Sequence, residues 1–307
     1  MRVALMIEGQ EDVTWDDWVA LADTCERWGI EALFRSDHYL SVMGEGKRGA
    51  LDAWATINAL AARTQKLRLG TMVSPASFRH PSELAKVVTT ADHVSGGRVE
   101  LGMGTGWSEA EHKAYGFPFF SMRERMDVLA EQLEIVHDGH WGDQPFSFHG
   151  EHYTLEDLDA RPKPIQRPHP PLIMGGKAGP RAARLAARFA DEYNTVMPTL
   201  EEITELRANI VAACDQAGRE AIPFSVMTGV LIGPDQASVD ARTRQLAESR
   251  RQQPDPETWI TGTVEEAAER LRSYEKAGVE RIYLQHLLHS DLDAVELIGR
   301  ELAPALA

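Results

Sequence analysis

The chain has 307 residues, and 32 Lys and Arg stand against 47 Asp and Glu, which leaves a formal net charge of −15. This acidic balance argues against binding to nucleic acid or to an anionic membrane, because both require clustered basic side chains. Two cysteines are too few for a disulfide framework, and the first apolar run, which ends at Glu8, is too short for a signal peptide. No stretch reaches the length of a membrane span, so we expect a cytoplasmic protein.

Short apolar runs, typical of buried strands, alternate along the chain with longer segments of helical periodicity. The predicted strands are 3–7, 32–35, 67–73, 99–103, 172–174, 192–196, 224–232 and 282–286. The predicted helices are 15–28, 52–64, 81–95, 123–137, 180–189, 201–216, 264–277 and 291–302. Eight strand–helix units predict an α/β fold, a (β/α)8 TIM barrel formed by one domain over residues 1–307; an open doubly wound sheet is the alternative.

One segment, 139–171, interrupts the alternation. It shows no helical pattern, and it contains prolines at positions 162, 164, 168, 170 and 171. Irregular segments of this length inside a compact domain are usually insertions or functional loops. Because the strand pattern resumes at Leu172, we expect an irregular proline-rich insertion before the fifth strand of the same barrel.

The residues that follow the strands are the candidates for a site, because a barrel carries its active site at the C-terminal ends of its strands. Asp37 and His38 follow the second strand. Histidine titrates near neutral pH and is the commonest acid or base in enzymes. Asp37 either orients the His38 ring or accepts a hydrogen bond from a ligand. A structural aspartate in a turn, beside an exposed histidine, is the alternative.

Two glycine turns follow the fourth and fifth strands. The first, Gly102-Met103-Gly104-Thr105-Gly106, is similar to the dinucleotide fingerprint G-x-G-x-x-G but does not match it, because Trp107 stands where that motif requires its last glycine. It predicts a tight turn that lets the backbone approach a ligand closely. The second, 175–179, includes Gly175 and Gly176 and opens a helix, which favours an anion; an ordinary glycine-rich turn is the alternative.

Other polar residues receive structural interpretations. Glu109 and Glu111 lie at a probable helix start, where acidic side chains interact favourably with the helix dipole, so we interpret both as capping residues. His149 and His152 do not have the spacing of a metal motif, and we expect no metal site.

Several segments, in this order, resemble the luciferase-like superfamily of flavin- or deazaflavin-dependent oxidoreductases, and the match runs nearly end to end. They are Ser36-Asp37-His38, 67–73 with Arg79-His80-Pro81, 97–102 leading to Gly104–Trp107, Phe148-His149-Gly150 with Tyr153, and the prolines that lead into 170–176. The Asp37-His38 pair is similar to the corresponding pair in the branch of this family that uses the deazaflavin F420. The resemblance implies a (β/α)8 barrel with a proline-rich insertion.

The resemblance also implies roles for individual residues. His38 and Asp37 would be the catalytic pair at the reactive face of the cofactor, and a non-prolyl cis peptide between Met72 and Val73 would support the ring from behind. The backbone of Gly104, Thr105, Gly106, Gly175 and Gly176 would hold the cofactor phosphate. Trp107 replaces a glutamate found in the sugar-phosphate dehydrogenases of this branch, so it would pack on the ring or the substrate in a more apolar pocket.

The function that the resemblance implies is F420-dependent hydride transfer to or from an unidentified small organic substrate. A reduced-FMN-dependent monooxygenase that uses O2 is the first alternative, and a non-catalytic flavin- or deazaflavin-binding protein is the second. We expect a homodimer, with no nucleic-acid or membrane partner. Substrate choice is expected to depend on residues 40–50, 107–120 and 139–170.

Overall fold

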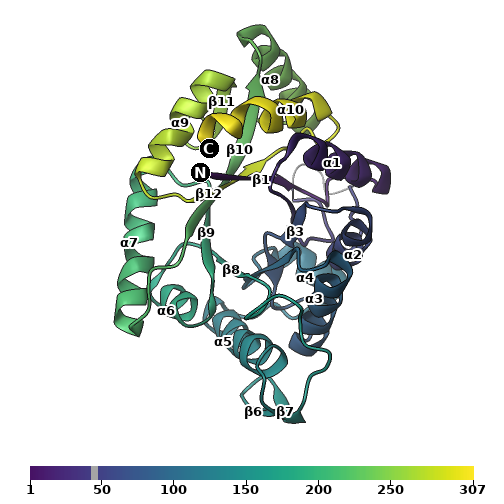
Figure 1. Ribbon diagram of the computed structural model, residues 1–307, viewed down its shortest axis with the longest axis vertical. Coiled ribbons are helices and arrows are strands. Elements are labelled where there is room, and N and C mark those ends of the chain that lie inside the picture. The colour runs from purple at the N-terminus through teal and green to yellow at the C-terminus, as the bar shows by residue number, and fades with distance from the viewer. Residues whose placement is uncertain (43–47) are drawn as a thin grey trace.

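The computed structural model describes residues 1–42 and 48–307, and its centre is a closed barrel of eight parallel strands (Figure 1). The strands are β1 (Arg2–Ile7), β2 (Ala32–Arg35), β3 (Arg68–Thr71), β5 (Val99–Gly104), β8 (Leu172–Gly175), β9 (Glu192–Val196), β10 (Phe224–Gly233) and β12 (Arg281–Gln285). Each strand pairs in parallel with the next, and β12 closes the ring by pairing with β10 and β1. The predicted barrel is therefore confirmed, and the open sheet is excluded.

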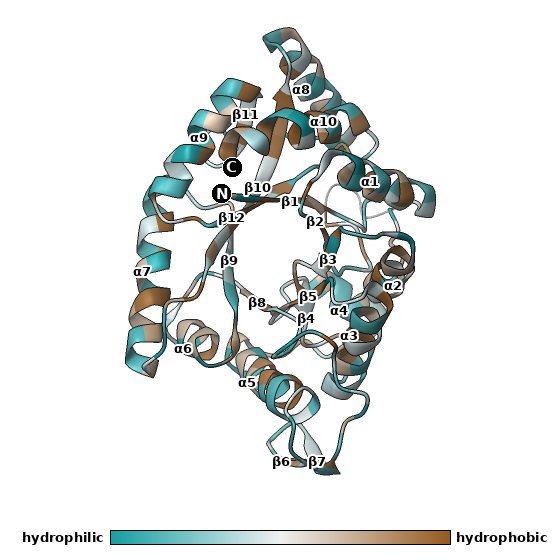
Figure 2. Cartoon of the chain, in the orientation of Figure 1, coloured by the Kyte–Doolittle hydropathy of each residue, from teal (hydrophilic) through white to brown (hydrophobic). Residues whose placement is uncertain are grey.

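Helices connect the strands and surround the barrel. They are α1 (Trp15–Trp28), α2 (Ala53–Arg63), α3 (Pro81–Ser95), α4 (Glu109–Tyr115), α5 (Met122–Glu134), α6 (Pro180–Phe189), α7 (Leu200–Ala217), α8 (Gln236–Arg250), α9 (Val264–Lys276) and α10 (Leu292–Leu297). Figure 2 shows the predominantly hydrophobic strands β1 and β10 surrounded by helices with many hydrophilic residues. Within the described residues, no helix is both long enough and apolar enough to cross a membrane.

Three parts of the chain differ from the prediction. Helix α8 was missed because it buries only Val239 and Leu246, so it has no apolar stripe to reveal its period. Strand β11 (Ile260–Thr263) was missed too, and it pairs with the far end of β10, outside the ring. The segment 139–171 is not wholly irregular, because β6 (Phe146–His149) and β7 (Thr154–Leu158) form an antiparallel hairpin that projects from the barrel in Figure 1.

Ionised side chains fill the barrel at the N-terminal ends of its strands. The guanidinium of Arg281 lies 2.7 Å from Glu100 and 3.4 Å from Glu192, and all three residues are buried. Burial alone would raise the pKa of Glu100, but Arg281 and Arg68 outweigh it and lower that pKa to about 2. Glu192, where burial dominates, has a raised pKa. This network therefore stabilises the end of the barrel opposite the expected site.

Replacing Arg281 with Met should lower the free energy of unfolding by about 3–5 kcal/mol, because Glu100 and Glu192 would remain buried without their cation. Urea unfolding followed by circular dichroism measures the effect. Arg300→Met removes an exposed ion pair with Glu296 and should leave the unfolding midpoint nearly unchanged. Equal midpoints for the two variants would contradict the stabilising role of Arg281.

Candidate active site

The C-terminal mouth of the barrel has an apolar floor. Side chains on alternate strand residues point inward, and those inside the barrel below the mouth form one cluster. Its members are Ala4, Met6, Ala32, Phe34, Met72, Ile173, Met227 and Tyr283. Continuing the same two-residue period along β1 and β2 places Glu8, Ser36 and His38 inward, above this floor. Polar groups thus surround an apolar base.

A carboxylate on helix α4 holds His38 at the mouth of the barrel. Its Nδ1 lies 2.7 Å from the Oε2 of Glu111, a fully buried residue on α4. The other oxygen of Glu111 accepts hydrogen bonds from the backbone N–H groups of Tyr39 and Leu40. Glu111 therefore fixes both the His38 ring and the turn that carries it. With Nδ1 engaged, Nε2 is the ring nitrogen left for a ligand.

This pairing changes how both groups titrate. Burial by itself lowers the pKa of His38, but the hydrogen bond and charge of Glu111, with smaller contributions from Glu8 and Asp37, raise it above the ordinary value of 6.5. Burial likewise raises the pKa of Glu111, but its bonds to His38 and the backbone N–H groups outweigh this and lower it. The proton of the pair is thus drawn to the imidazole, which is suited to donating one near neutral pH.

Asp37, predicted to act beside His38, faces away from the histidine ring. Its carboxylate accepts from the Ser74 hydroxyl at 2.6 Å and from the Arg79 guanidinium at 2.6 Å, and only 1% of the residue is exposed. The hypothesis that Asp37 orients the ring is wrong, because Glu111 occupies that position. Glu109 and Glu111 both lie in the first turn of α4, as the capping interpretation expected, but that interpretation missed the bond of Glu111 to His38.

The peptide bond between Met72 and Val73 is cis, as the resemblance implied. Three glycines of neighbouring strands surround the Val73 side chain, and they are Gly102 and Gly104 on β5 and Gly175 on β8. A Cβ on Gly104 would lie 2.7 Å from a methyl of Val73, and one on Gly175 would lie 3.1 Å away. These positions need glycine because the valine side chain fills the space.

The two glycine turns lie side by side. Strands β5 and β8 pair with Met103 opposite Met174, so Gly104 and Gly175 begin their turns next to each other. In the second turn, however, two backbone N–H groups already have partners: Gly176 donates to Asn194 and Ala178 to the Tyr193 hydroxyl. The number of free N–H donors in this predicted anion cradle is therefore smaller than the sequence suggested.

A cavity of about 350 Å³ opens beside the first glycine turn, at Thr105. Its polar lining is cationic or neutral, with Arg79, His80, Arg125 and His152, and it contains no carboxylate. Arg125 supports the turn by donating to the carbonyl of Gly106, and the Nε2 of His152 is buried without a hydrogen-bond partner. The cavity therefore fits an anionic group that accepts hydrogen bonds. Arg125 was not predicted as a site residue, and His152 was considered only as a metal ligand, because their positions in this cavity depend on helix α5 and the hairpin.

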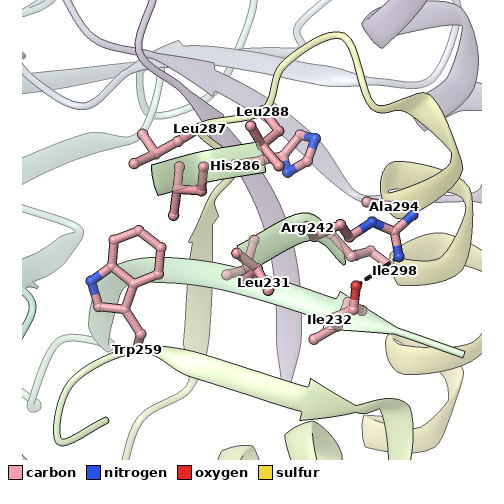
Figure 3. Close-up of a pocket in the computed structure, with 11 residues that line it drawn as sticks. Leu231, Ile232, Arg242, Trp259, His286, Leu287, Leu288, Ala294 and Ile298 are labelled. Carbon is pink, nitrogen blue, oxygen red and sulfur yellow. Dashed lines mark hydrogen bonds between the residues drawn. The ribbon is translucent and has the colours of Figure 1, made fainter. Parts of the chain in front are cut away.

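A second cavity, between β10, α8 and α10, has a volume of only about 10 Å³ (Figure 3). Leu231, Trp259 and Leu287 make its wall apolar. His286 at its edge is neutral near pH 7, because burial lowers its pKa to about 4. A space for at most one water molecule is a packing defect, not a ligand site.

Trp107 lies at the mouth with 63% of its surface exposed, and its ring meets the edge of His38 at a centroid distance of 5.6 Å. It thus offers an exposed aromatic surface next to the histidine. Of the segment 40–50, expected to choose the substrate, residues 43–47 lie outside the described residues. Among those described, no group of three or more His, Cys, Asp or Glu has the arrangement to hold a metal ion.

Replacing Glu111 with Gln should lower the pKa of His38, because the charge that favours the imidazolium is removed. In the native protein, the pair's contribution to the free energy of unfolding is complete between pH 4.5 and pH 6.5, the ordinary pKa values of Glu111 and His38, and is lost as pH rises through the higher native pKa of His38. The variant should lose this dependence. NMR titration of the histidine Cε1–H signals and urea unfolding across neutral pH measure both effects.

Glu109→Gln is the matched control, since Glu109 is exposed two residues away on α4. It should leave the titration of His38 unchanged. A Glu111→Gln protein in which His38 titrates as in the wild type would contradict the assigned pairing.

The chain also matches known proteins. Residues 1–281 match the family described as luciferase-like monooxygenase. An FMNH2-dependent dimethylsulfone monooxygenase of Pseudomonas putida is 28% identical, over 92% of this chain and 86% of its own. An F420-dependent glucose-6-phosphate dehydrogenase of Nakamurella multipartita is 26% identical, over 93% and 91% respectively.

Solved structures agree on the fold. An F420-dependent secondary alcohol dehydrogenase, in complex with an F420–acetone adduct, superimposes with a TM-score of 0.84 over 100% of this chain and 99% of its own, at 20% identity. The family and the barrel fold that the resemblance implied are therefore confirmed. The chain belongs to the luciferase-like monooxygenase family.

Proposed function

We propose that this protein is an F420-dependent oxidoreductase that transfers a hydride between the deazaflavin and a small organic substrate. The observation that carries the proposal is the His38–Glu111 pair at the barrel mouth, a proton donor and acceptor held at 2.7 Å above an apolar floor. The cofactor supplies the hydride chemistry, and the protein supplies binding, orientation and the proton.

The residues at the mouth fit a flat ring with an anionic tail. Gly104 and Gly175 leave room on two adjacent strands for the Val73 side chain, which would form the surface behind the ring. The cavity at Thr105 is lined by Arg125 and His152 without a carboxylate, and the unpartnered Nε2 of His152 calls for an acceptor such as a phosphate oxygen. We infer that Gly104, Thr105, Gly106, Gly175 and Gly176 border the cofactor, with Arg125 near its phosphate.

The proposed roles of the chain's own groups follow from their contacts. Nδ1 of His38 is held by Glu111, so Nε2 is placed to give a proton to, or take one from, the substrate. Asp37 acts indirectly, because it anchors Arg79 and Ser74 beneath the turn that carries His38. Met72 and Val73 would support the ring from behind, and Trp107 would cover its open side.

A reduced-FMN monooxygenase is the second candidate, and one comparison favours it: the similarity to the FMNH2-dependent enzyme extends over 92% of this chain. Similarity of comparable extent supports F420, at 93%. The resemblance of the Asp37-His38 pair to the F420 branch is the reason for our choice. A homodimer remains a prediction.

Fluorescence titration with F420 and FMN, each oxidised and reduced, tests the cofactor. We expect F420 to bind with a micromolar dissociation constant and FMN to bind more weakly. Arg125→Met should weaken the binding of phosphorylated F420 about tenfold and the binding of its dephosphorylated chromophore less, because the charged contact is lost together with the hydrogen bonds to Gly106 and Phe120. Arg123→Met, exposed on the same helix, is the control. Preference for reduced FMN would favour the monooxygenase, and binding of neither cofactor would overturn both proposals.

His38→Gln separates an enzyme from a binding protein. Glutamine retains polar groups but cannot shuttle a proton, so we expect turnover with an accepted substrate to fall by about 10²-fold or more. Cofactor affinity, measured by the same titration, should remain within about twofold. Unchanged turnover would remove His38 from the mechanism.

A further inference from the structure

A chain of hydrogen bonds runs around the barrel mouth and ends in an acceptor without a donor. The backbone N–H of Gly9 donates to the Ser36 hydroxyl at 2.9 Å, and that hydroxyl donates to Oε1 of Gln10 at 2.5 Å. The amide nitrogens of Gln10 and Gln285 then donate to the two oxygens of Glu8, at 2.7 and 2.5 Å. Each bond fixes the orientation of the next group.

The orientation of the Gln285 amide follows from this chain. Its nitrogen is committed to Glu8, so its oxygen Oε1 has to be the other end of the amide. That oxygen is buried without a hydrogen-bond partner, in a side chain that is only 3% exposed. An unpaired buried acceptor is costly, and a donor on a bound molecule would remove the cost.

Glu8 is likewise incompletely compensated. It is 8% exposed, and it forms no ion pair with any residue in the described part of the chain. The neighbouring carboxylates differ, because Asp37 is paired with Arg79 and Glu111 with His38. Two neutral amides do not neutralise a carboxylate as a cation does. The Glu8 carboxylate can therefore accept a further hydrogen bond.

Strand register places the Glu8 carboxylate and the Gln285 amide at the same end of the barrel as His38. Met6 is opposite Gln285 on β12, and Ile7 is opposite Arg35 on β2, so Glu8 lies between Gln285 and the residues that lead to His38. The charge of Glu8 is among those that raise the pKa of His38. Around Gln285 the floor is made partly of methionines, Met6 and Met227, whose flexible side chains can repack around a ligand.

We propose that Glu8 and Gln285 determine substrate specificity by accepting hydrogen bonds from an O–H or N–H group of the substrate, held at the mouth beside His38. The substrate is therefore a small organic molecule with a hydroxyl or protonated amino group. This inference rests on the proposed function only in placing the substrate at the barrel mouth. It adds a polar requirement to the apolar surface that Trp107 offers there.

Three ring compounds of similar size provide the probes: tetrahydropyran-4-ol and piperidine each carry a donor, and tetrahydropyran carries none. The protein is loaded with whichever of F420 and FMN it binds, and each probe is titrated while the His38 Cε1–H NMR signal is followed. That signal is assigned by its loss in His38→Gln. We expect the two donor-bearing rings to bind about tenfold more tightly than tetrahydropyran, as one hydrogen bond to a charged acceptor suggests.

Glu8→Gln and Gln285→Met each remove part of the acceptor pair, and in both variants the preference for donor-bearing rings should fall to about equal binding. Gln216→Met is the matched control, because Gln216 is exposed near the C-terminal end of α7, at the opposite end of the barrel. It should retain the full preference. All three variants should bind the cofactor as the wild type does.

The possible outcomes separate this inference from the proposed function. A wild-type protein without preference for donor-bearing rings, including one that binds no probe, overturns the inference even when cofactor binding is normal. A preference that survives in either folded variant overturns it too. If neither cofactor binds, the proposed function fails, and the same titration of the cofactor-free protein still decides whether the acceptor pair recognises donors.

Discussion

The guanidinium of Arg281, buried inside the barrel, is the interaction on which the architecture most depends. It binds Glu100 of β5 and Glu192 of β9 from its own position on β12, so one cation joins three strands across the interior. Buried charges are tolerated only when they are paired. At the N-terminal end of the barrel, Arg281 meets that condition through Glu100 and Glu192, although its Nε is buried without a hydrogen-bond partner.

The C-terminal end of the barrel differs from the N-terminal end in its side chains and in its hydrogen bonding. Its floor is apolar, and above this floor stand carboxylates and amides whose hydrogen bonds are only partly complete. Glu111 is paired with His38 and Asp37 with Arg79, but Glu8 has amide donors alone. A ligand is the natural source of the missing partners, because a surface that satisfied all of its own groups would have little with which to recognise one.

The position of His38 depends on a contact between distant parts of the chain. Helix α4 follows β5, yet its Glu111 reaches the turn after β2 and holds both the imidazole and the backbone there. The proton affinity of His38 is therefore set by a residue 73 positions away. The glycines around Val73 act similarly, since β5 and β8 together provide the space that the valine side chain fills.

The sequence by itself determined the strands, most of the helices and the end of the barrel at which polar residues collect, because apolar periodicity and glycine turns are local signals. It also located His38 and the glycine turns on which the family resemblance depends. Only the tertiary structure decided which carboxylate meets His38, since Asp37 is adjacent in sequence but turned toward Arg79. It also revealed helix α8, which has no apolar stripe, and the free acceptor of Gln285, because hydrogen-bond partners from separate strands leave no pattern along the chain.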